Sequence, residues 1–318
     1  MKHPTISVVI PVKNESTNIR RCLDGILSQT VDVMDIVVVD SGSTDGTLEI
    51  LNEYDKVKTV KIDPSEFNHG LTRNLGVQHT KGELVVLTVG DARPADDQWL
   101  EKMVRHFKDP EVAGVCGQQV VPHEKDKNPH QWFRPQHPPG ARKYQFNSPA
   151  EFKNLSPGEK YTICRWDDVT AVYRKKILNL IPFHQVTYGE DMVWAKEALS
   201  RGFKIVYDTS ALVYHYHDTN FAFQYKRTLT VLYHVYKYFD FIKPNPFNAS
   251  YPFRVIYRNF RYRAEMRWIG YNLIRMAATV RAHRHIRKWE LKGKEYLDDM
   301  HNRICGIAPQ PEKQASTV

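Results

Sequence analysis

The sequence predicts an α/β fold in which a mainly parallel sheet is flanked by helices and followed by a C-terminal helical extension. Over the first 120 residues, short apolar runs rich in β-branched residues alternate with segments whose apolar residues recur at helical spacing. This alternation is typical of a parallel sheet with crossover helices. Two of the apolar runs, in 5–12 and 36–47, stop abruptly at polar, turn-forming residues. Beyond residue 219, helical segments are separated by proline-containing turns.

Five strands are predicted in the first 121 residues, because each apolar run is short and is bounded by polar or turn-forming residues. Four helices are predicted between the strands. In the first helix Ile19, Leu23 and Ile26 lie on one apolar stripe. The predicted strands are 5–12, 35–40, 57–62, 83–89 and 113–121, and the predicted helices are 16–29, 44–54, 69–79 and 96–108.

The pattern changes between residues 122 and 160, where seven prolines are mixed with His, Lys and Asn without periodicity. We predict a long mobile loop (122–160) over the edge of the sheet, since loops of this length are usually functional or disordered. Regular structure resumes after this loop, and a first domain is predicted over residues 1–218, followed by a basic, aromatic-rich helical extension over 219–318. The later elements are predicted as strands at 168–173, 203–207 and 211–215 and helices at 174–180 and 190–201.

Composition places the chain among ordinary globular proteins. It has 318 residues, of which 42% are hydrophobic and 25% charged. This is enough for one large α/β domain and an appendage.

The four cysteines lie far apart without metal-ligand spacing, which favours reduced thiols inside the cell. The N-terminus runs directly into the first strand, and no run of about 18 apolar residues occurs. We therefore expect a cytoplasmic protein without a signal peptide or a transmembrane helix.

Most of the positive charge lies in one stretch, residues 243–294. This stretch contains 13 Lys and Arg against two acidic residues, whereas the whole chain has a net charge of +9. Interleaved Tyr, Phe and Trp favour a helix at the cytoplasmic face of a membrane. Nucleic-acid binding would use the same charge, but no such motif accompanies it and no nucleic-acid partner is expected. Basic helices with solvated charges are the remaining alternative.

Polar residues follow the first two strands, at the edge where parallel sheets bind ligands. The second strand ends on Asp40, whose carboxylate suits a base or a ribose, and the Ser-Gly-Ser-Thr-Asp-Gly-Thr turn after it could wrap a ligand. We predict that a nucleoside lies between these strand ends. The alternative is that the polar residues only cap strands and helices. The predicted nucleoside-binding residues are Pro11, Val12, Asn14, Glu15, Asp40, Ser41 and Gly42.

Two further segments suit a diphosphate and a metal ion. Arg73, in the first turn of a predicted helix, is placed to pair with a diphosphate; otherwise it is a surface arginine. Asp91 follows the fourth strand and offers a carboxylate to a hard cation such as Mg²⁺ or Mn²⁺. His215 and His217 lie on one face of a strand, where either could reach a metal or a phosphate. The alternative for the histidines is a purely structural role.

Two acidic groups are candidates for catalysis and acceptor binding. Glu190 and Asp191 open a helix. Adjacent acids there often only complement the helix dipole, but one that faced the nucleotide would be a general base. Trp166, Asp167 and Asp168 precede a strand and suit an acceptor sugar, whose apolar face stacks on an aromatic ring while its hydroxyls bond to carboxylates. The alternative is a core tryptophan beside a solvent-facing acidic turn.

The order of these motifs resembles that of family 2 inverting glycosyltransferases, which have the GT-A fold with a Rossmann-like sheet. The resemblance covers about residues 5–218. Phe-Asn-His-Gly-Leu-Thr-Arg-Asn, the Asp-Ala-Arg-Pro ending and the late His-x-His are most similar to rhamnosyltransferases of bacterial surface polysaccharide synthesis. The motifs that carry the family resemblance are Val-Ile-Pro-Val-Lys-Asn-Glu, Val-Val-Val-Asp-Ser-Gly-Ser-Thr-Asp-Gly-Thr, Arg-Asn-x-Gly, Asp-Ala-x-Pro after a strand, and Gly-Glu-Asp.

The resemblance implies a hexosyltransferase that moves a sugar, L-rhamnose from dTDP-rhamnose in this subgroup, onto a hydroxyl of a glycan or lipid-linked glycan. Residues 1–121 would be the nucleotide-binding half and 122–218 the acceptor half. Arg73 would meet the diphosphate, and Asp191 would be the catalytic base. Asp91 stands at the last position of the family's Asp-x-Asp metal motif.

One departure from the family pattern concerns the metal. Val89 stands at the first position of the Asp-x-Asp motif, so Asp91 would be the one carboxylate ligand, with His217 or His215 as a second ligand. A UDP- or GDP-sugar donor and a sugar-nucleotide-binding protein without catalysis are alternatives. A nucleotidyltransferase is disfavoured because residues 11–15 lack the glycines of a phosphate-binding loop.

Overall fold

The computed structural model describes residues 4–132 and 139–306. The chain divides into two compact units, of which the second comprises residues 121–134 and 216–318 and the first comprises the rest. The boundary after residue 215 lies close to the predicted boundary after 218. The segment 121–134, by contrast, was predicted within the first domain and groups with the second unit.

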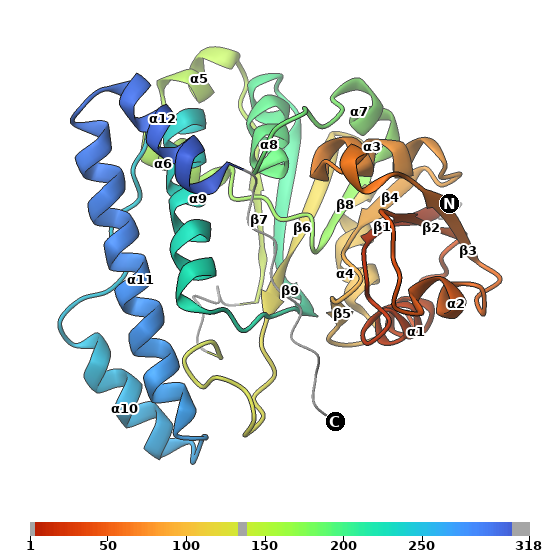
Figure 1. The fold of residues 1–318 in the computed structure, drawn as a ribbon. Helices are drawn as coiled ribbons and strands as arrows, with labels where there is room; N and C mark the ends of the chain where they lie inside the picture. Colours follow the sequence, from red (N-terminus) through yellow and green to blue (C-terminus); the bar gives the residue numbers. More distant parts are fainter. Residues whose placement is uncertain (1–3, 133–138, 307–318) are drawn as a thin grey trace. The chain divides into compact units, whose positions relative to one another are not determined.

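The first unit is built on a nine-stranded sheet, counted over the described residues (Figure 1). The strands are β1 (Ile6–Val12), β2 (Asp35–Asp40), β3 (Val57–Lys61), β4 (Leu84–Leu87), β5 (Arg93–Pro94), β6 (Val112–Val120), β7 (Ala141–Tyr144), β8 (Ala171–Arg174) and β9 (Lys204–Tyr214). Strands β3, β2, β1 and β4 are parallel neighbours, and β8 lies antiparallel between β4 and β6. β9 runs parallel to β6, and the short strands β7 and β5 pair antiparallel with β9.

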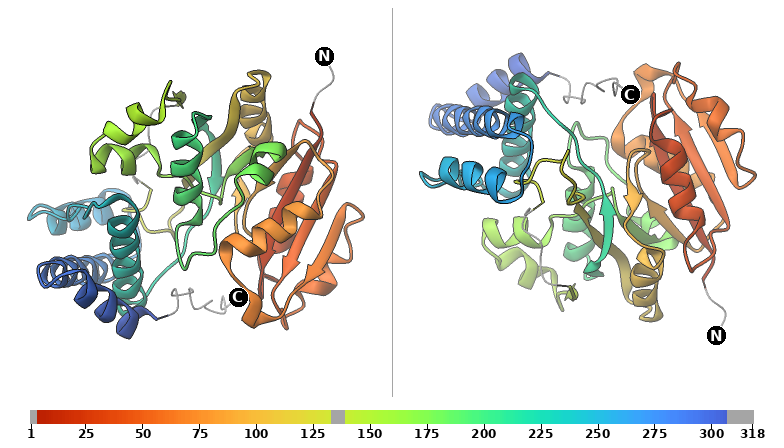
Figure 2. Two further views of the ribbon diagram at one scale, coloured as in Figure 1. Left: turned by 90° about the horizontal axis from the view of Figure 1, so that it is seen from above. Right: turned by 90° about the horizontal axis from the view of Figure 1, so that it is seen from below.

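Helices cover both faces of the parallel strands. The α-helices of the first unit are α1 (Ile19–Leu27), α2 (Thr47–Leu51), α3 (His69–Gln78), α4 (Trp99–Val104), α5 (Pro149–Asn154), α6 (Pro157–Ile163), α7 (Lys175–Leu180) and α8 (Glu190–Ser200). Figure 2 shows α3 over one face of the parallel strands and α1 over the other.

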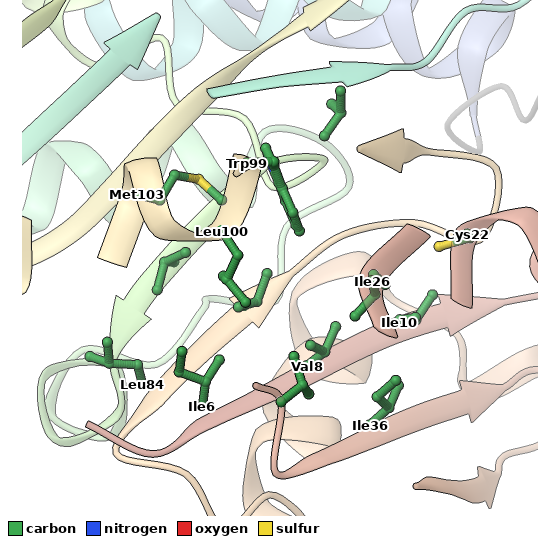
Figure 3. Close-up of a cluster of buried hydrophobic side chains, with 14 of the residues drawn as sticks. Ile6, Val8, Ile10, Cys22, Ile26, Ile36, Leu84, Trp99, Leu100 and Met103 are labelled. Carbon is green, nitrogen blue, oxygen red and sulfur yellow. The ribbon is translucent and has the colours of Figure 1, made fainter. Parts of the chain in front are cut away.

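The alternation of side chains along β1 explains this two-sided burial. Ile6, Val8 and Ile10 point to one face, where they pack with α1 and α4 in the cluster drawn in Figure 3. Val9 points to the other face, where α3 crosses so closely that a Cβ added to Gly76 would lie 2.3 Å from Val9 Cγ1. A strand buried on both faces is apolar along nearly its whole length, and this is why β1 reads as a near-continuous apolar run that only Ser7 interrupts.

The strands and helices predicted over residues 1–121 are confirmed, with ends that differ by a few residues. The irregular loop predicted over 122–160 is wrong in part, because β7 and α5 lie within it and α6 begins in it. Residues 133–138 of that loop lie outside the described residues. α5 and α6 begin at serine caps, where Ser148 and Ser156 accept backbone N–H groups and a proline follows. These are ordinary helix-start signals that the density of prolines obscured.

The two strands predicted at 203–207 and 211–215 form the single strand β9. The polar residues that separated the two predicted strands form a bulge where the pairing with β6 shifts register. Asp208 is fully buried there and accepts the backbone N–H of Ser210 at 3.0 Å and Nη2 of Arg105 at 2.8 Å. Because the buried carboxylate is satisfied by these bonds, the strand continues through the polar segment.

The second unit is helical, which confirms the predicted C-terminal extension. Its helices are α9 (Phe221–Phe239), α10 (Tyr251–Arg261), α11 (Arg267–Glu290) and α12 (Lys294–Cys305). Leu232 of α9, Ile286 and Trp289 of α11 and Leu297 of α12 share a buried cluster, and α11 packs along α9 (Figure 1). The four cysteines of the chain, all within the described residues, are buried and form no disulfide. Within residues 4–132 and 139–306, no helix is long and apolar enough to cross a membrane.

Candidate active site

The turns after β1 and β2 are tied to each other by side-chain hydrogen bonds. The backbone N–H of Asn14 donates to Ser43 Oγ at 2.8 Å, and Asn14 Oδ1 accepts the backbone N–H of Thr44 at 2.8 Å. Asn14 has a φ of 54°, a conformation that asparagine adopts more readily than most residues. The two strand ends therefore form one fixed polar edge.

Asp40, the last residue of β2, closes its own turn. Its buried carboxylate accepts the backbone N–H of Gly42 at 3.1 Å and that of Ser43 at 3.2 Å. Ser41 donates from its backbone N–H and from Oγ to the carbonyl of Val12, at 3.0 and 3.1 Å. Asp40 thus maintains the shape of the polar edge, and its contact with a base or a ribose stays a prediction.

The end of β4 lies directly against the end of β1. A Cβ added to Gly90 would lie 2.8 Å from Glu15 Cγ and 3.2 Å from Val12 Cγ1, and Glu15 is buried there. Pro11, on β1, is partly buried. Asp91 follows Gly90, so it lies beside the polar edge, at the carboxyl ends of the parallel strands where α/β sheets bind ligands.

Asp91 and His215 form a pair of potential metal ligands within the first unit. His215 Nε2 lies 3.5 Å from Asp91 Oδ1. On its other side, His215 Nδ1 lies 2.8 Å from Gln119 Oε1, and Gln119 Nε2 donates to the carboxylate of Asp167. His217 follows His215 by two residues and belongs to the second unit. Because two residues of chain span at most about 7 Å, the predicted role of His217 is compatible with the position of His215.

This series of contacts determines which nitrogen of His215 carries the hydrogen. A carboxylate only accepts hydrogen bonds, so Asp167 requires the NH₂ of Gln119, and the amide oxygen must then face His215. Nδ1 of His215 therefore donates to Gln119, and Nε2, 3.5 Å from Asp91 Oδ1, is the nitrogen placed to bind a cation. A carboxylate oxygen and an imidazole nitrogen oriented by a hydrogen-bond partner are a donor set that fits a divalent cation. Val89 adds no side-chain donor to this set.

Arg73 on α3 is buried between two acidic residues. One terminal nitrogen donates to Glu190 Oε1 at 2.6 Å and to the carbonyl of His69 at 3.0 Å, and Nε lies 3.4 Å from Asp168 Oδ2. Arg73 is only 4% exposed. The guanidinium is thus paired with carboxylates of the protein itself, and its contact with a diphosphate stays a prediction.

Several carboxylates lie around this one guanidinium, and their pKa values show the effect. Burial raises the pKa of Asp168 to about 7, a shift that Arg73 opposes and Glu190 reinforces. Burial also raises the pKa of Asp191 well above its ordinary value, and the carboxylates of Glu190, Asp168 and Asp167 add to this. Of the two acids that open α8, Glu190 is bound by Arg73, and Asp191 is the one with increased basicity.

Trp166 lies in the core of the first unit. Its ring is 3% exposed and lies 5.4 Å from the ring of Trp194, and its Nε1–H donates to the hydroxyl of Tyr173 at 2.6 Å. This burial argues against the predicted stacking on an acceptor sugar, because almost no ring surface is exposed. Asp168 is also buried and accepts the Tyr173 hydroxyl. Asp167 is the partly exposed member of the predicted acceptor group.

Residues 7–179 match the sequence model of the family described as Glycosyl transferase family 2. The chain belongs to this family. It is 32% identical over 219 residues to the O-antigen chain rhamnosyltransferase RfbN of Salmonella typhimurium, covering 67% of each chain. It is 30% identical over 222 residues to the O-antigen chain rhamnosyltransferase WbaN of Salmonella anatum, covering 68% of this chain and 67% of that one. The protein is therefore a glycosyltransferase.

The fold of this glycosyltransferase is similar to that of the mannosyltransferase PcManGT from Pyrobaculum calidifontis, which was solved in complex with GDP-Man and Mn²⁺. The TM-score is 0.57 at 17% identity, and the match covers 94% of this chain and 79% of that one. At this identity the likeness concerns the fold alone. It confirms the predicted GT-A architecture, a mainly parallel sheet flanked by helices.

Sequence reasoning did not single out Gln119 and Tyr173 in this glycosyltransferase. A signal was available for Gln119. Two polar residues, Gln118 and Gln119, stand near the carboxyl end of β6, a strand that is otherwise apolar. Tyr173 lies within an apolar strand, where no pattern distinguishes it from a core aromatic residue. Its contact with Asp168 depends on how the chain folds back between them.

Proposed function

We propose that this glycosyltransferase transfers L-rhamnose from dTDP-rhamnose to a hydroxyl group of a glycan or lipid-linked glycan, with inversion at the anomeric carbon. The two Salmonella relatives are named as O-antigen chain rhamnosyltransferases, which supports the sugar. The observation that carries the reaction is the pair of acids at the start of α8, where Arg73 binds Glu190 and the adjacent Asp191 has a raised pKa.

The polar edge formed by the turns after β1 and β2 would hold the nucleoside. Asn14 and Asp40 keep these turns in one shape, so the site would not have to be ordered when the donor binds. Arg73 would act on the diphosphate through its positive charge near the start of α3, since one of its two terminal nitrogens is already bonded to Glu190.

Asp91 and His215 would hold Mg²⁺ or Mn²⁺, with His217 as a further ligand. The orientation of His215 by Gln119 supports this assignment, and the fold relative PcManGT was solved with Mn²⁺ and GDP-Man. When bound, the cation would neutralise charge on the departing nucleoside diphosphate. The valine at position 89 would leave coordination positions to water or phosphate oxygens, an arrangement that is common for Mg²⁺.

Asp191 would be the general base. Its carboxylate would take the proton of the acceptor hydroxyl while the hydroxyl oxygen bonds to the anomeric carbon from the face opposite the diphosphate. The bond between that carbon and the diphosphate oxygen breaks, and the configuration inverts. A raised pKa makes the carboxylate a better proton acceptor. Asp167, partly exposed and held by Gln119, would bond to hydroxyl groups of the acceptor.

A lipid-linked acceptor would place the reaction at the cytoplasmic face of a membrane. The basic stretch 243–294, with 13 Lys and Arg against two acidic residues, would hold the enzyme there as a peripheral protein, because anionic lipids attract such segments.

The experiment is a donor screen with acceptor. Purified protein is mixed with dTDP-rhamnose, a UDP-sugar or a GDP-sugar, with and without Mn²⁺, and both thermal stabilisation and release of nucleoside diphosphate are measured. We expect the largest stabilisation from dTDP-rhamnose and a release of dTDP that depends on added acceptor glycan. Stabilisation by a UDP- or GDP-sugar alone would overturn the donor assignment. Binding without acceptor-dependent release would favour a sugar-nucleotide-binding protein, the alternative that the missing carboxylate at Val89 motivates.

A further inference from the structure

Helix α10 presents an apolar face to solvent. Phe253 is 74% exposed, Tyr257 65% and Phe260 64%, although large apolar side chains are usually buried. The other side of the helix is anchored, because Val255 and Asn259 are buried and α10 packs on α11. The tertiary structure of the second unit thus holds the aromatic side outward.

Helical geometry separates the outward side chains of α10 into two adjoining groups, of which all but the half-buried Arg258 are exposed. At about 100° per residue, the four exposed apolar residues fall within an arc of about 100°, and three arginines lie within the next arc of about 60°. α10 contains no acidic residue. The apolar residues are Phe253, Ile256, Tyr257 and Phe260, and the arginines are Arg254, Arg258 and Arg261.

We propose that this face of α10, Phe253 to Phe260 with its flanking arginines, docks the protein on a bilayer that contains anionic lipids. Aromatic rings settle at the boundary between headgroups and acyl chains, and arginines beside them are placed to meet lipid phosphates. The proposal assigns the membrane contact of the basic stretch 243–294 to one face of one helix. It does not depend on the donor or the sugar that the enzyme uses.

Charge complementarity selects a lipid surface over the other partners of an exposed apolar face. The 13 Lys and Arg against two acidic residues in 243–294 match a surface of uniform negative charge better than a protein surface of mixed charge. A nucleic acid would satisfy the arginines but would leave a continuous arc of apolar side chains without an apolar counterpart. A bilayer interface offers negative charge to the arginines and an apolar layer to the neighbouring apolar side chains.

The test is flotation of the full chain with two kinds of vesicle, one of phosphatidylcholine alone and one that also contains phosphatidylglycerol. We expect binding to the anionic vesicles that weakens with added salt, and little binding to the neutral ones. The triple variant Phe253→Ser, Tyr257→Ser, Phe260→Ser should lose at least ten-fold in affinity. Its thermal midpoint should be unchanged, because the replaced side chains are exposed.

Two matched controls separate this face from general surface properties. Leu291→Ser removes an apolar side chain that is 85% exposed outside α10, and it should bind like the wild type. Arg254→Gln with Arg261→Gln should lose about 5-fold per charge, more than Arg303→Gln on α12, where the side chain is also exposed. Equal binding of the triple variant and the wild type, equal binding to both vesicles, or no vesicle binding would each overturn the proposal.

Discussion

The free energy of unfolding of the wild type should fall as the pH rises through about 7. Replacing Asp168 by asparagine should remove this fall. Burial raises the pKa of this carboxyl group to about 7 in the folded chain, against about 4 in an unfolded chain. The folded state therefore holds the proton more tightly than the unfolded state. The stability that results is fully present below about pH 4 and is lost as the pH rises through about 7. Asparagine has a similar shape and does not ionise.

The expected size follows from these two pKa values. Each pH unit between them corresponds to about 1.4 kcal/mol in the free energy of unfolding, so the wild type should lose about 2–3 kcal/mol through Asp168 between pH 5 and 8.5. Asp168→Asn also removes one of the negative charges that raise the pKa of Asp191. The free energy of unfolding of the variant should therefore depend even less on pH. Glu190 still pairs with Arg73 at 2.6 Å in the variant, so the guanidinium is not left alone in the core.

The assay is urea unfolding at pH 5, 7 and 8.5 for the wild type, Asp168→Asn and the control Asp32→Asn. The carboxylate of Asp32 is 87% exposed and pairs with Lys56 at the surface, and such pairs contribute little to stability. The control should follow the wild-type pH dependence, and Asp168→Asn should be flatter. Three parallel curves would refute the inference that the buried cluster binds a proton in this pH range.

Three further substitutions test the site and the fold. Asp191→Asn should lower turnover by about 10²–10⁴-fold, the usual cost of removing a positioned base, while dTDP still binds in a calorimeter; an active variant would contradict the assignment. Gln119→Leu removes the partner that orients His215, so the dissociation constant for Mn²⁺ should rise about 10–100-fold in titration calorimetry, and an unchanged constant would argue against this orientation. Gly76→Ala places a methyl group 2.3 Å from a valine of β1 and should lower the free energy of unfolding by about 1–3 kcal/mol. The control Gly270→Ala, which meets nothing within 4 Å, should not destabilise the protein.

The parallel half of the sheet was predictable because its signals are local. Apolar runs and the turns after them identified β1, β2 and β4, and the bonds between Asn14 and the turn at 43–44 join two neighbouring strand ends that the topology brings together. The errors in the fold had local causes as well. The many prolines hid the starts of α5 and α6. The polar residues around Asp208 divided β9 into two predicted strands, because sequence does not show where a buried carboxylate finds its partners.

The sequence by itself determined the family, the order of the strand ends and the acids that open α8, since each is encoded in a few consecutive residues. Only the tertiary structure decided what those residues contact. It paired Arg73 with Glu190, 117 residues away, and oriented His215 through Gln119, 96 residues away. It also buried Trp166 and turned the aromatic side of α10 outward. The physical reason is that periodicity shows which side chains share a face, whereas burial and pKa depend on the elements that cover that face.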